Sequence, residues 1–249
     1  MKRYIILLIT VIVASCGSYR DKSGNSELAV QTEFSSNTDG RGQVFTIDFR
    51  AGDSFYYPMM AFWLEDMDSS YLQTLYVARS VATGVFKYGR QEGNRWVESD
   101  RRAPQALPYW SHQRGIMASD GLFMPEPGNP VPDAYTGATP VTGFVLTARA
   151  DKMLQGRVRL LMEINQNWDW NQYWTNDRFP GDENYAMSAQ PALVYEVILD
   201  IESNGGPYNM KPIGHSHWSG RTGELFPDFS TLTTALDITG YLTVIVSGN

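Results

Sequence analysis

The three histidines of the chain are its clearest candidates for metal chemistry. His215 and His217 form an H-x-H pair, and His112 is the third. Residues two apart project to the same face of a β-strand, so both imidazoles of the pair can reach one ion if they lie on a strand. Three imidazoles with one open position suit zinc or copper. The alternative is that the pair lies at the end of a sheet and bonds to neighbouring groups.

A run of aromatic and amide residues at 167–177 indicates a different chemistry. It places Trp168, Trp170 and Trp174 among asparagines, aspartates and a glutamine. Aromatic faces beside amides and carboxylates can stack on a sugar and hydrogen-bond to it, so the three tryptophans are candidate glycan-binding residues. The same Asp and Asn oxygens suit calcium, although the spacing of an EF-hand is absent. In the alternative interpretation the tryptophans cap a sandwich core.

The only cysteine of the chain, Cys16, follows Lys2, Arg3 and an apolar run at 4–14. This order of a charged segment, a short apolar segment, small residues and cysteine resembles a bacterial lipoprotein signal. Eleven residues are too few to cross a bilayer, which needs about 20. The resemblance implies a signal peptide over residues 1–15 and lipid on Cys16. It also implies a location on the extracytoplasmic side of a bacterial cell envelope, with the outer membrane favoured over the inner one. An ordinary secretion signal or a buried N-terminal strand is the alternative.

Composition narrows the partners of the chain. Residues 1–15 carry two of the 20 basic residues and none of the 27 acidic ones, so the remaining 234 residues have a formal charge of −9. Nothing basic is clustered, which excludes nucleic acid as an expected partner. Anionic lipid would also repel this chain, so the lipid on Cys16 is the expected link to the membrane. Common hydrolase and phosphate-binding motifs are missing, which favours a non-catalytic protein over an enzyme.

Hydrophobic periodicity predicts an all-β protein. Residues 16–42 are polar and are expected to form a flexible tether, followed by a single domain over 43–249. A short helix is expected within 101–114, and connections at 85–142 and 165–190 are too long for simple turns. The pattern predicts an antiparallel, immunoglobulin-like β-sandwich with long loop insertions and at most short helices. The expected strands lie at 45–50, 57–64, 72–81, 143–150, 158–164, 193–201 and 242–246.

The segment Asp133-Ala134-Tyr135-Thr136-Gly137-Ala138-Thr139 resembles the acceptor motif of covalently flavinylated bacterial proteins. The resemblance implies that a flavin transferase attaches FMN to the hydroxyl of Thr139. The alternative is a Thr/Gly turn that leads into the strand at 143–150.

Three blocks together resemble an uncharacterised family of predicted bacterial periplasmic proteins. They are 61–66 with 74–77, then 132–139, then the strand at 156–163. Members of that family look like secreted β-sandwiches and tend to be encoded beside flavin transferases. The resemblance favours a lipid-anchored, non-catalytic binding or accessory module that serves an extracytoplasmic flavin or metal system. Two alternatives stay open: a redox or metal protein that uses FMN at Thr139 or the three histidines, and a glycan-binding lipoprotein.

Overall fold

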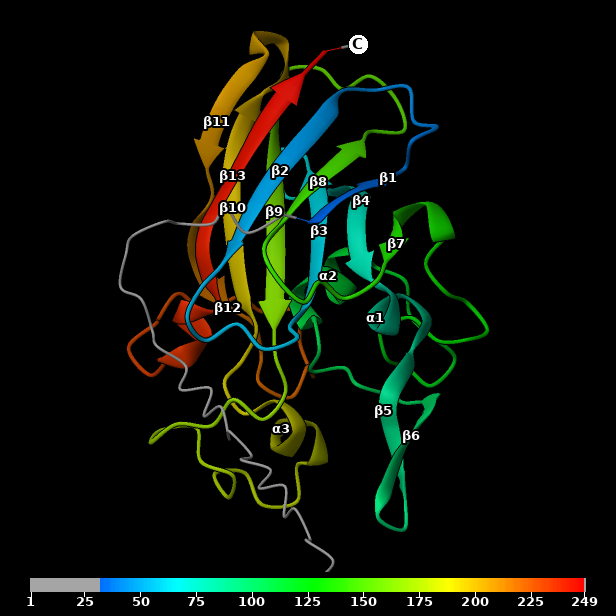
Figure 1. Cartoon of the computed structure of the whole chain (residues 1–249), viewed down its shortest axis with the longest axis vertical. Coiled ribbons are helices and arrows are strands. Elements are labelled where there is room, and N and C mark those ends of the chain that lie inside the picture. Colours follow the sequence, from blue (N-terminus) through cyan, green and yellow to red (C-terminus); the bar gives the residue numbers. More distant parts are fainter. Residues whose placement is uncertain (1–31, 249) are drawn as a thin grey trace, which may run out of the picture. The chain divides into compact units, whose positions relative to one another are not determined.

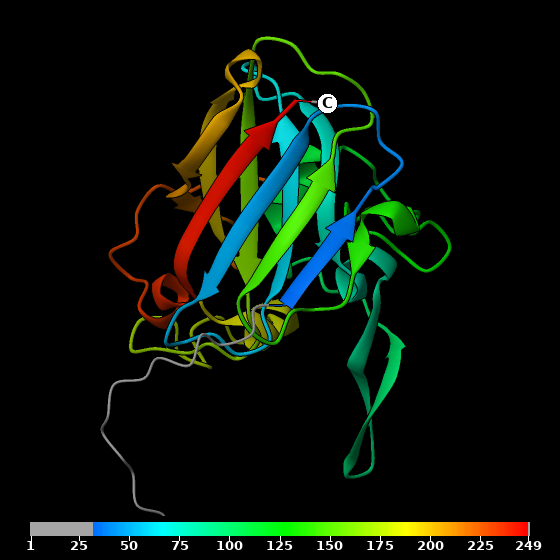
Figure 2. The ribbon, with the colours of Figure 1, turned by 45° about the horizontal axis from the view of Figure 1, so that its top comes forward.

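The computed structural model describes residues 32–248, which belong to one compact unit built on two packed β-sheets (Figure 1). Figure 2 shows the five-stranded sheet in front of the six-stranded sheet. The first sheet has the order β1 (Thr32–Ser36), β8 (Phe144–Arg149), β2 (Val44–Ala51), β13 (Thr239–Ser247) and β11 (Gly205–Asn209). The second has the order β12 (Lys211–His215), β10 (Leu193–Asp200), β9 (Arg157–Asn165), β3 (Met59–Glu65), β4 (Tyr71–Ala78) and β7 (Thr136–Gly137).

The other elements are short. A separate hairpin is formed by β5 (Val85–Glu92) and β6 (Arg95–Asp100). Within residues 32–248 the α-helices are α1 (Arg79–Thr83), α2 (Pro108–Gln113) and α3 (Glu183–Ser188). Single 3-10 turns are η1 (Asp133–Tyr135), η2 (Ile201–Ser203) and η3 (Thr234–Asp237). The all-β prediction with short helices is therefore confirmed.

The main core lies between the two sheets. Phe45, Ile47 and Phe49 of β2 are fully buried and alternate with polar residues, as a strand with one face in a core requires. From the other sheet, Phe62 of β3 and its cross-strand partner Met162 of β9 belong to the same buried cluster. Burial of these apolar side chains is what holds the sheets together.

A second core covers the outer face of the six-stranded sheet. Every residue of β3 is buried, because the connection at 79–135 packs over the face that would otherwise meet solvent. Trp63 and Leu161 of the sheet meet Leu107 and Trp110 of the connection in this cluster. Much of this long connection is therefore a packing layer.

Two predictions about the strands need correction. The tether was expected to reach residue 42, but Thr32–Ser36 is β1, so the folded domain begins earlier than residue 43. The sandwich is also not wholly antiparallel, because β1 pairs with β8 and β4 pairs with β7 in parallel. β1 and β7 are both short strands at the edge of a sheet, and each pairs with only one neighbour. Few backbone hydrogen bonds therefore determine whether such a strand runs parallel or antiparallel to that neighbour.

Candidate functional site

The H-x-H pair does not lie on one strand. His215 is the last residue of β12 and is buried, with its ring stacked on Phe226 at 5.4 Å and its Nδ1 2.9 Å from the Ser216 carbonyl oxygen. His217 lies beyond the strand, where its Nδ1 accepts a hydrogen bond from the Ser219 backbone N–H at 3.2 Å. Burial is the main cause that lowers the pKa of both imidazoles, which favours their neutral forms.

The third histidine has partners of its own. His112 lies on α2, with its Nδ1 2.8 Å from the Pro108 carbonyl oxygen and its ring 4.5 Å from that of Phe123. Throughout residues 32–248, no group of three or more His, Cys, Asp or Glu side chains is placed to hold a metal ion. This finding contradicts the predicted three-ligand site of His112, His215 and His217, and the pair does not share a strand face because β12 ends at His215.

The segment that resembles a flavin acceptor forms an edge of the six-stranded sheet. It folds as η1 followed by β7, and Gly137 lies against Tyr76 so closely that a Cβ there would be 2.6 Å from the ring. The Tyr76 hydroxyl donates to the Ala138 carbonyl oxygen at 2.7 Å. Thr139 follows as a half-buried residue, and neither of the two hollows described below is lined by it. These contacts use the motif for packing at the sheet edge, and attachment of FMN to Thr139 stays a prediction.

The three tryptophans expected to bind a glycan separate into two groups. Trp174 is 4% exposed, and its indole N–H donates to the Thr231 hydroxyl at 3.2 Å, so it belongs to the core. The prediction that Trp174 contacts a ligand is therefore wrong. Trp168 and Trp170 are each 43% exposed and present their rings to solvent.

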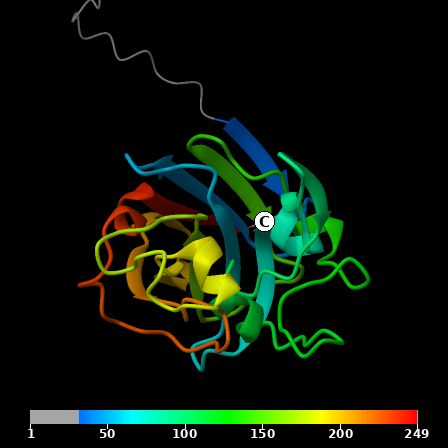
Figure 3. The same ribbon diagram turned by 90° about the horizontal axis from the view of Figure 1, so that it is seen from below.

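Other exposed aromatic residues lie beside them. Trp96 on β6 is 41% exposed, and its ring centroid is 6.5 Å from that of Trp168. The Tyr56 backbone N–H donates to Oε1 of Gln166 at 3.1 Å, which ties the β2–β3 loop to the loop after β9. We define the aromatic end as the exposed aromatic residues of the β2–β3 loop, β6 and the loop after β9: Tyr56, Tyr57, Trp96, Trp168, Trp170 and Tyr173. Figure 3 shows the molecule from the side on which α3 and the loop after β9 lie. Each exposed tryptophan of the described chain belongs to the aromatic end.

A polar network fixes the loop after β9, which carries most of the aromatic end. The buried Gln190 side chain donates to the Asp169 carbonyl oxygen at 3.0 Å and accepts from the Thr233 backbone N–H at 2.7 Å. Oδ1 of Asn171 accepts from the backbone N–H groups of Tyr173 and Trp174 at 2.9 and 2.7 Å. The loop is therefore held by named hydrogen bonds, which preorganises the rings it presents.

Two of the six non-glycine residues with positive φ in the described chain belong to the aromatic end. Trp168 has φ +60° and Tyr57 has φ +49°, which is the left-handed region that large side chains rarely adopt. Such conformations persist only when surrounding contacts impose them, and they gather at ligand-binding positions. The Trp168 backbone N–H donates to the Met187 carbonyl oxygen at 3.0 Å, which is one of the contacts that hold it.

An open hollow of about 540 Å³ is lined by Tyr173 of the aromatic end. Apart from the Tyr173 ring, its lining consists of amide and hydroxyl side chains: Asn171, Gln172, Ser230, Thr231 and Thr233. Amides and hydroxyls both donate and accept hydrogen bonds, so they match a ligand rich in hydroxyl groups. The hollow and the exposed rings together supply apolar faces beside hydrogen-bonding groups.

The charge of this region is negative. Residues 166–190 contain four acidic residues and one basic residue, Arg178. The Arg178 guanidinium lies 3.6 Å from the centre of the Tyr173 ring, so this cation covers one face of that ring. The net charge of the loop after β9 therefore disfavours anionic ligands at the rings that this loop carries.

Two buried carboxylates lie under the outer layer. Glu163 of β9 accepts hydrogen bonds from the backbone N–H groups of Tyr109 and Trp110, and Glu65 of β3 accepts one from the Trp63 indole at 2.8 Å. Both glutamates have no exposed surface. They hold packed elements together and do not face a solvent-accessible site. The sequence offered no signal for them, because 27 acidic residues give too many pairs.

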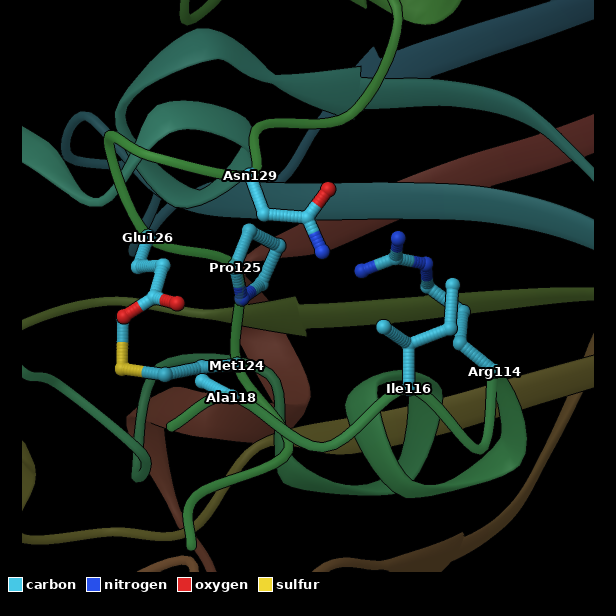
Figure 4. Close-up of a pocket in the computed structure, with 7 residues that line it drawn as sticks. All are labelled: Arg114, Ile116, Ala118, Met124, Pro125, Glu126 and Asn129. Carbon is cyan, nitrogen blue, oxygen red and sulfur yellow. The ribbon is translucent and has the colours of Figure 1, made fainter. Parts of the chain in front are cut away.

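A small hollow lies beside Arg114 (Figure 4). Its volume is about 10 Å³, and its lining includes Met124, Glu126 and Asn129. Such a volume holds about one water molecule. A water there would satisfy the buried Nη1 of Arg114, which has no hydrogen-bond partner. The hollow is too small for a substrate or cofactor.

In the part of the chain that the structure describes, no helix is both long enough and apolar enough to span a membrane. Comparison with protein-family models, curated proteins and solved structures gives no match to this chain.

Proposed function

We propose that this protein is a non-catalytic carbohydrate-binding module that lipid on Cys16 anchors in a bacterial cell envelope. The observation that carries the proposal is the aromatic end, where Trp96, Trp168 and Trp170 are exposed while Trp63, Trp110 and Trp174 are buried. Exposed aromatic residues in contiguous patches mark binding surfaces. They lie on loops and a hairpin carried by a rigid sandwich, where binding residues are commonly found.

The chemistry of the surface favours a carbohydrate. A sugar ring has apolar C–H faces and a rim of hydroxyl groups, so it matches flat aromatic rings beside amides and hydroxyls. The hollow next to Tyr173 supplies such groups from the Gln172 amide and the Ser230 hydroxyl, whereas the Asn171 amide is engaged within the loop. The four acidic residues at 166–190 disfavour nucleic acid and anionic lipid, which the same rings would otherwise contact.

The test is binding of the full chain to a panel of neutral oligosaccharides. The variants are Trp168→Ala and Trp170→Ala, and the matched control is Tyr241→Ala, because Tyr241 is 45% exposed and lies on β13, outside the loops and the hairpin that carry the aromatic end. We expect each tryptophan variant to weaken binding roughly tenfold or more and the control to bind as the original chain does. Equal binding by all variants would contradict the proposal. Binding to anionic vesicles but to no oligosaccharide would instead assign the aromatic end to a membrane.

The anchor is a separate part of the proposal. Cys16 and the signal at 1–15 lie outside the described residues, as does the part of the proposed tether before residue 32. We expect Cys16→Ser to move the protein from the membrane fraction to the soluble extracytoplasmic fraction, because nothing else in the proposal attaches it to lipid. Fractionation after a high-salt wash checks this, and a variant that still sediments with membranes would refute the lipid anchor.

A further inference from the structure

The β5–β6 hairpin stands apart from the sandwich. Figures 1 and 2 show it extending past the sheets at the end where α3 lies. It forms a sheet of its own, and none of its strand residues is fully buried. A two-stranded hairpin without a sheet or helix to cover it is marginally stable in water. Its position must therefore depend on its base and on contacts near its tip.

The base of the hairpin is a compact joint. α1 packs against β5, and the Arg101 backbone N–H donates to the Gly84 carbonyl oxygen at 2.9 Å. Gly84 has φ +68°, which ends α1 and turns the chain into the hairpin. A Cβ at Gly89 would be 2.5 Å from the Ser99 carbonyl oxygen, at the place where the pairing of β5 and β6 shifts register. The hairpin is therefore attached through this joint, and the pairing of its strands is irregular near Gly89.

Near the tip, the hairpin meets the rest of the molecule through an aromatic pair. Trp96 comes from β6 and Trp168 from the loop after β9, and their ring planes make an angle of 55° at a centroid distance of 6.5 Å. Both rings stay more than 40% exposed in this contact. The pair is therefore loose, and each indole still has surface available for a ligand.

We propose that Trp96 and Trp168 are the two sides of one sugar-binding clamp and that the β5–β6 hairpin is its movable side. This inference rests on the proposed function and adds a residue, Trp96, and a motion to it. A ring held between two indoles needs van der Waals contact on both sides, about 3.5–4.0 Å each, or about 7–8 Å in all. The present centroid distance of 6.5 Å is about 0.5 Å below the lower end of that range and about 1.5 Å below its upper end.

A small movement of the hairpin would open the clamp. Bending at its base displaces the tip, so an opening of about 1 Å with rotation of one ring requires little change at the joint. Elements with few buried contacts are the ones that move at low free-energy cost. The tilted rings then become the two walls of a slot for a sugar ring, and the hollow beside Tyr173 supplies hydrogen bonds to the neighbouring part of the ligand.

The test uses the full chain with cello-, xylo-, manno- and chito-hexaose as probes, and binding is measured by calorimetry and tryptophan fluorescence. The variants are Trp96→Ala, Trp168→Ala and the double variant. Tyr88→Ala is the control, because Tyr88 is an exposed aromatic residue on the same hairpin. Trp96→Phe retains an aromatic face and should restore most of the affinity. Thermal unfolding confirms that each variant is folded.

We expect Trp96→Ala and Trp168→Ala each to weaken binding roughly tenfold, with the double variant losing less than the product of the two. If Trp96→Ala binds normally while Trp168→Ala binds weakly, the clamp is wrong but the proposed carbohydrate-binding function is not contradicted. Equal loss in Tyr88→Ala would also overturn it, because the effect would then belong to the hairpin as a whole. If the original chain binds none of the probes, the clamp and the proposed function both fail for this ligand class.

Discussion

Replacing Glu163 by glutamine is expected to remove a pH-dependent part of the free energy of unfolding. Oε1 and Oε2 of Glu163 accept hydrogen bonds from the backbone N–H groups of Tyr109 and Trp110 at 3.1 and 2.8 Å. These N–H groups begin α2, and Leu107, at its N-cap, provides no side-chain hydrogen bond. A carboxylate from β9 therefore caps the helix and ties the outer layer to the sheet.

The size and sign of the effect follow from the burial of this group. Burial raises the pKa of Glu163 from 4.5 to about 7, and the two backbone hydrogen bonds oppose that rise. The folded state therefore binds the proton more tightly than the unfolded state. The resulting stabilisation is fully present below pH 4.5 and is lost as the pH rises through about 7. The raised pKa corresponds to about 3 kcal/mol between these limits.

The assay is denaturant unfolding of the original chain and Glu163→Gln at about pH 5 and about pH 8. Glutamine cannot ionise, so the variant lacks this pH dependence. The free energy of unfolding of the original chain minus that of the variant should therefore fall by about 3 kcal/mol between the lower and the higher pH. His215 and His217 titrate in both proteins and cancel in the difference. Glu98→Gln, an exposed residue on β6, is the control and should show no such trend. A difference that stays constant or grows with pH would refute this reasoning.

Two further substitutions test the packing. Arg159→Met is expected to lower the free energy of unfolding by about 3–5 kcal/mol, because the Arg159 guanidinium lies 2.7 Å from the fully buried carboxylate of Glu65. A loss of less than about 1 kcal/mol in denaturant unfolding would contradict that role. Gly137→Ala is expected to lower the free energy of unfolding by about 1–3 kcal/mol, because its Cβ would lie 2.6 Å from the buried Tyr76 ring. The control is Gly128→Ala, whose Cβ would meet no atom within 4 Å, so its stability should be nearly unchanged. Equal melting temperatures for the two glycine variants would show that β7 shifts freely.

Strands with a simple periodicity were predictable from the sequence. The alternation in β2 and the two-sided apolar pattern of β3 both follow from which faces are buried. β1 and β7 were missed because short parallel edge strands carry little alternation of their own. The β5–β6 hairpin was missed because its residues are mostly polar and exposed, so no hydrophobic pattern marks it.

The candidate site was predictable only in part. Trp168, Trp170 and Trp174 share one loop, and nothing in their spacing shows which ring turns inward; packing against Tyr185 and Trp218 buries Trp174. Trp96 comes from a distant segment, so only the fold brings it to Trp168. The histidine prediction depended on a strand that continues through residue 217, but β12 ends at His215.

The most direct test of the proposed function is an NMR titration. An oligosaccharide that the protein binds is added to the isotopically labelled protein, and the indole N–H signals of its tryptophans are followed. The chain has seven tryptophans, which report on both the surface and the core. The buried indoles are engaged inside the protein: Trp63 donates to Glu65, Trp110 to Thr74 and Trp174 to Thr231. We predict that the signals of the exposed residues Trp96, Trp168 and Trp170 shift on binding, while those of Trp63 and Trp110 in the core stay in place. A bound oligosaccharide that leaves the three exposed signals unchanged would contradict the assignment of the aromatic end as a carbohydrate site.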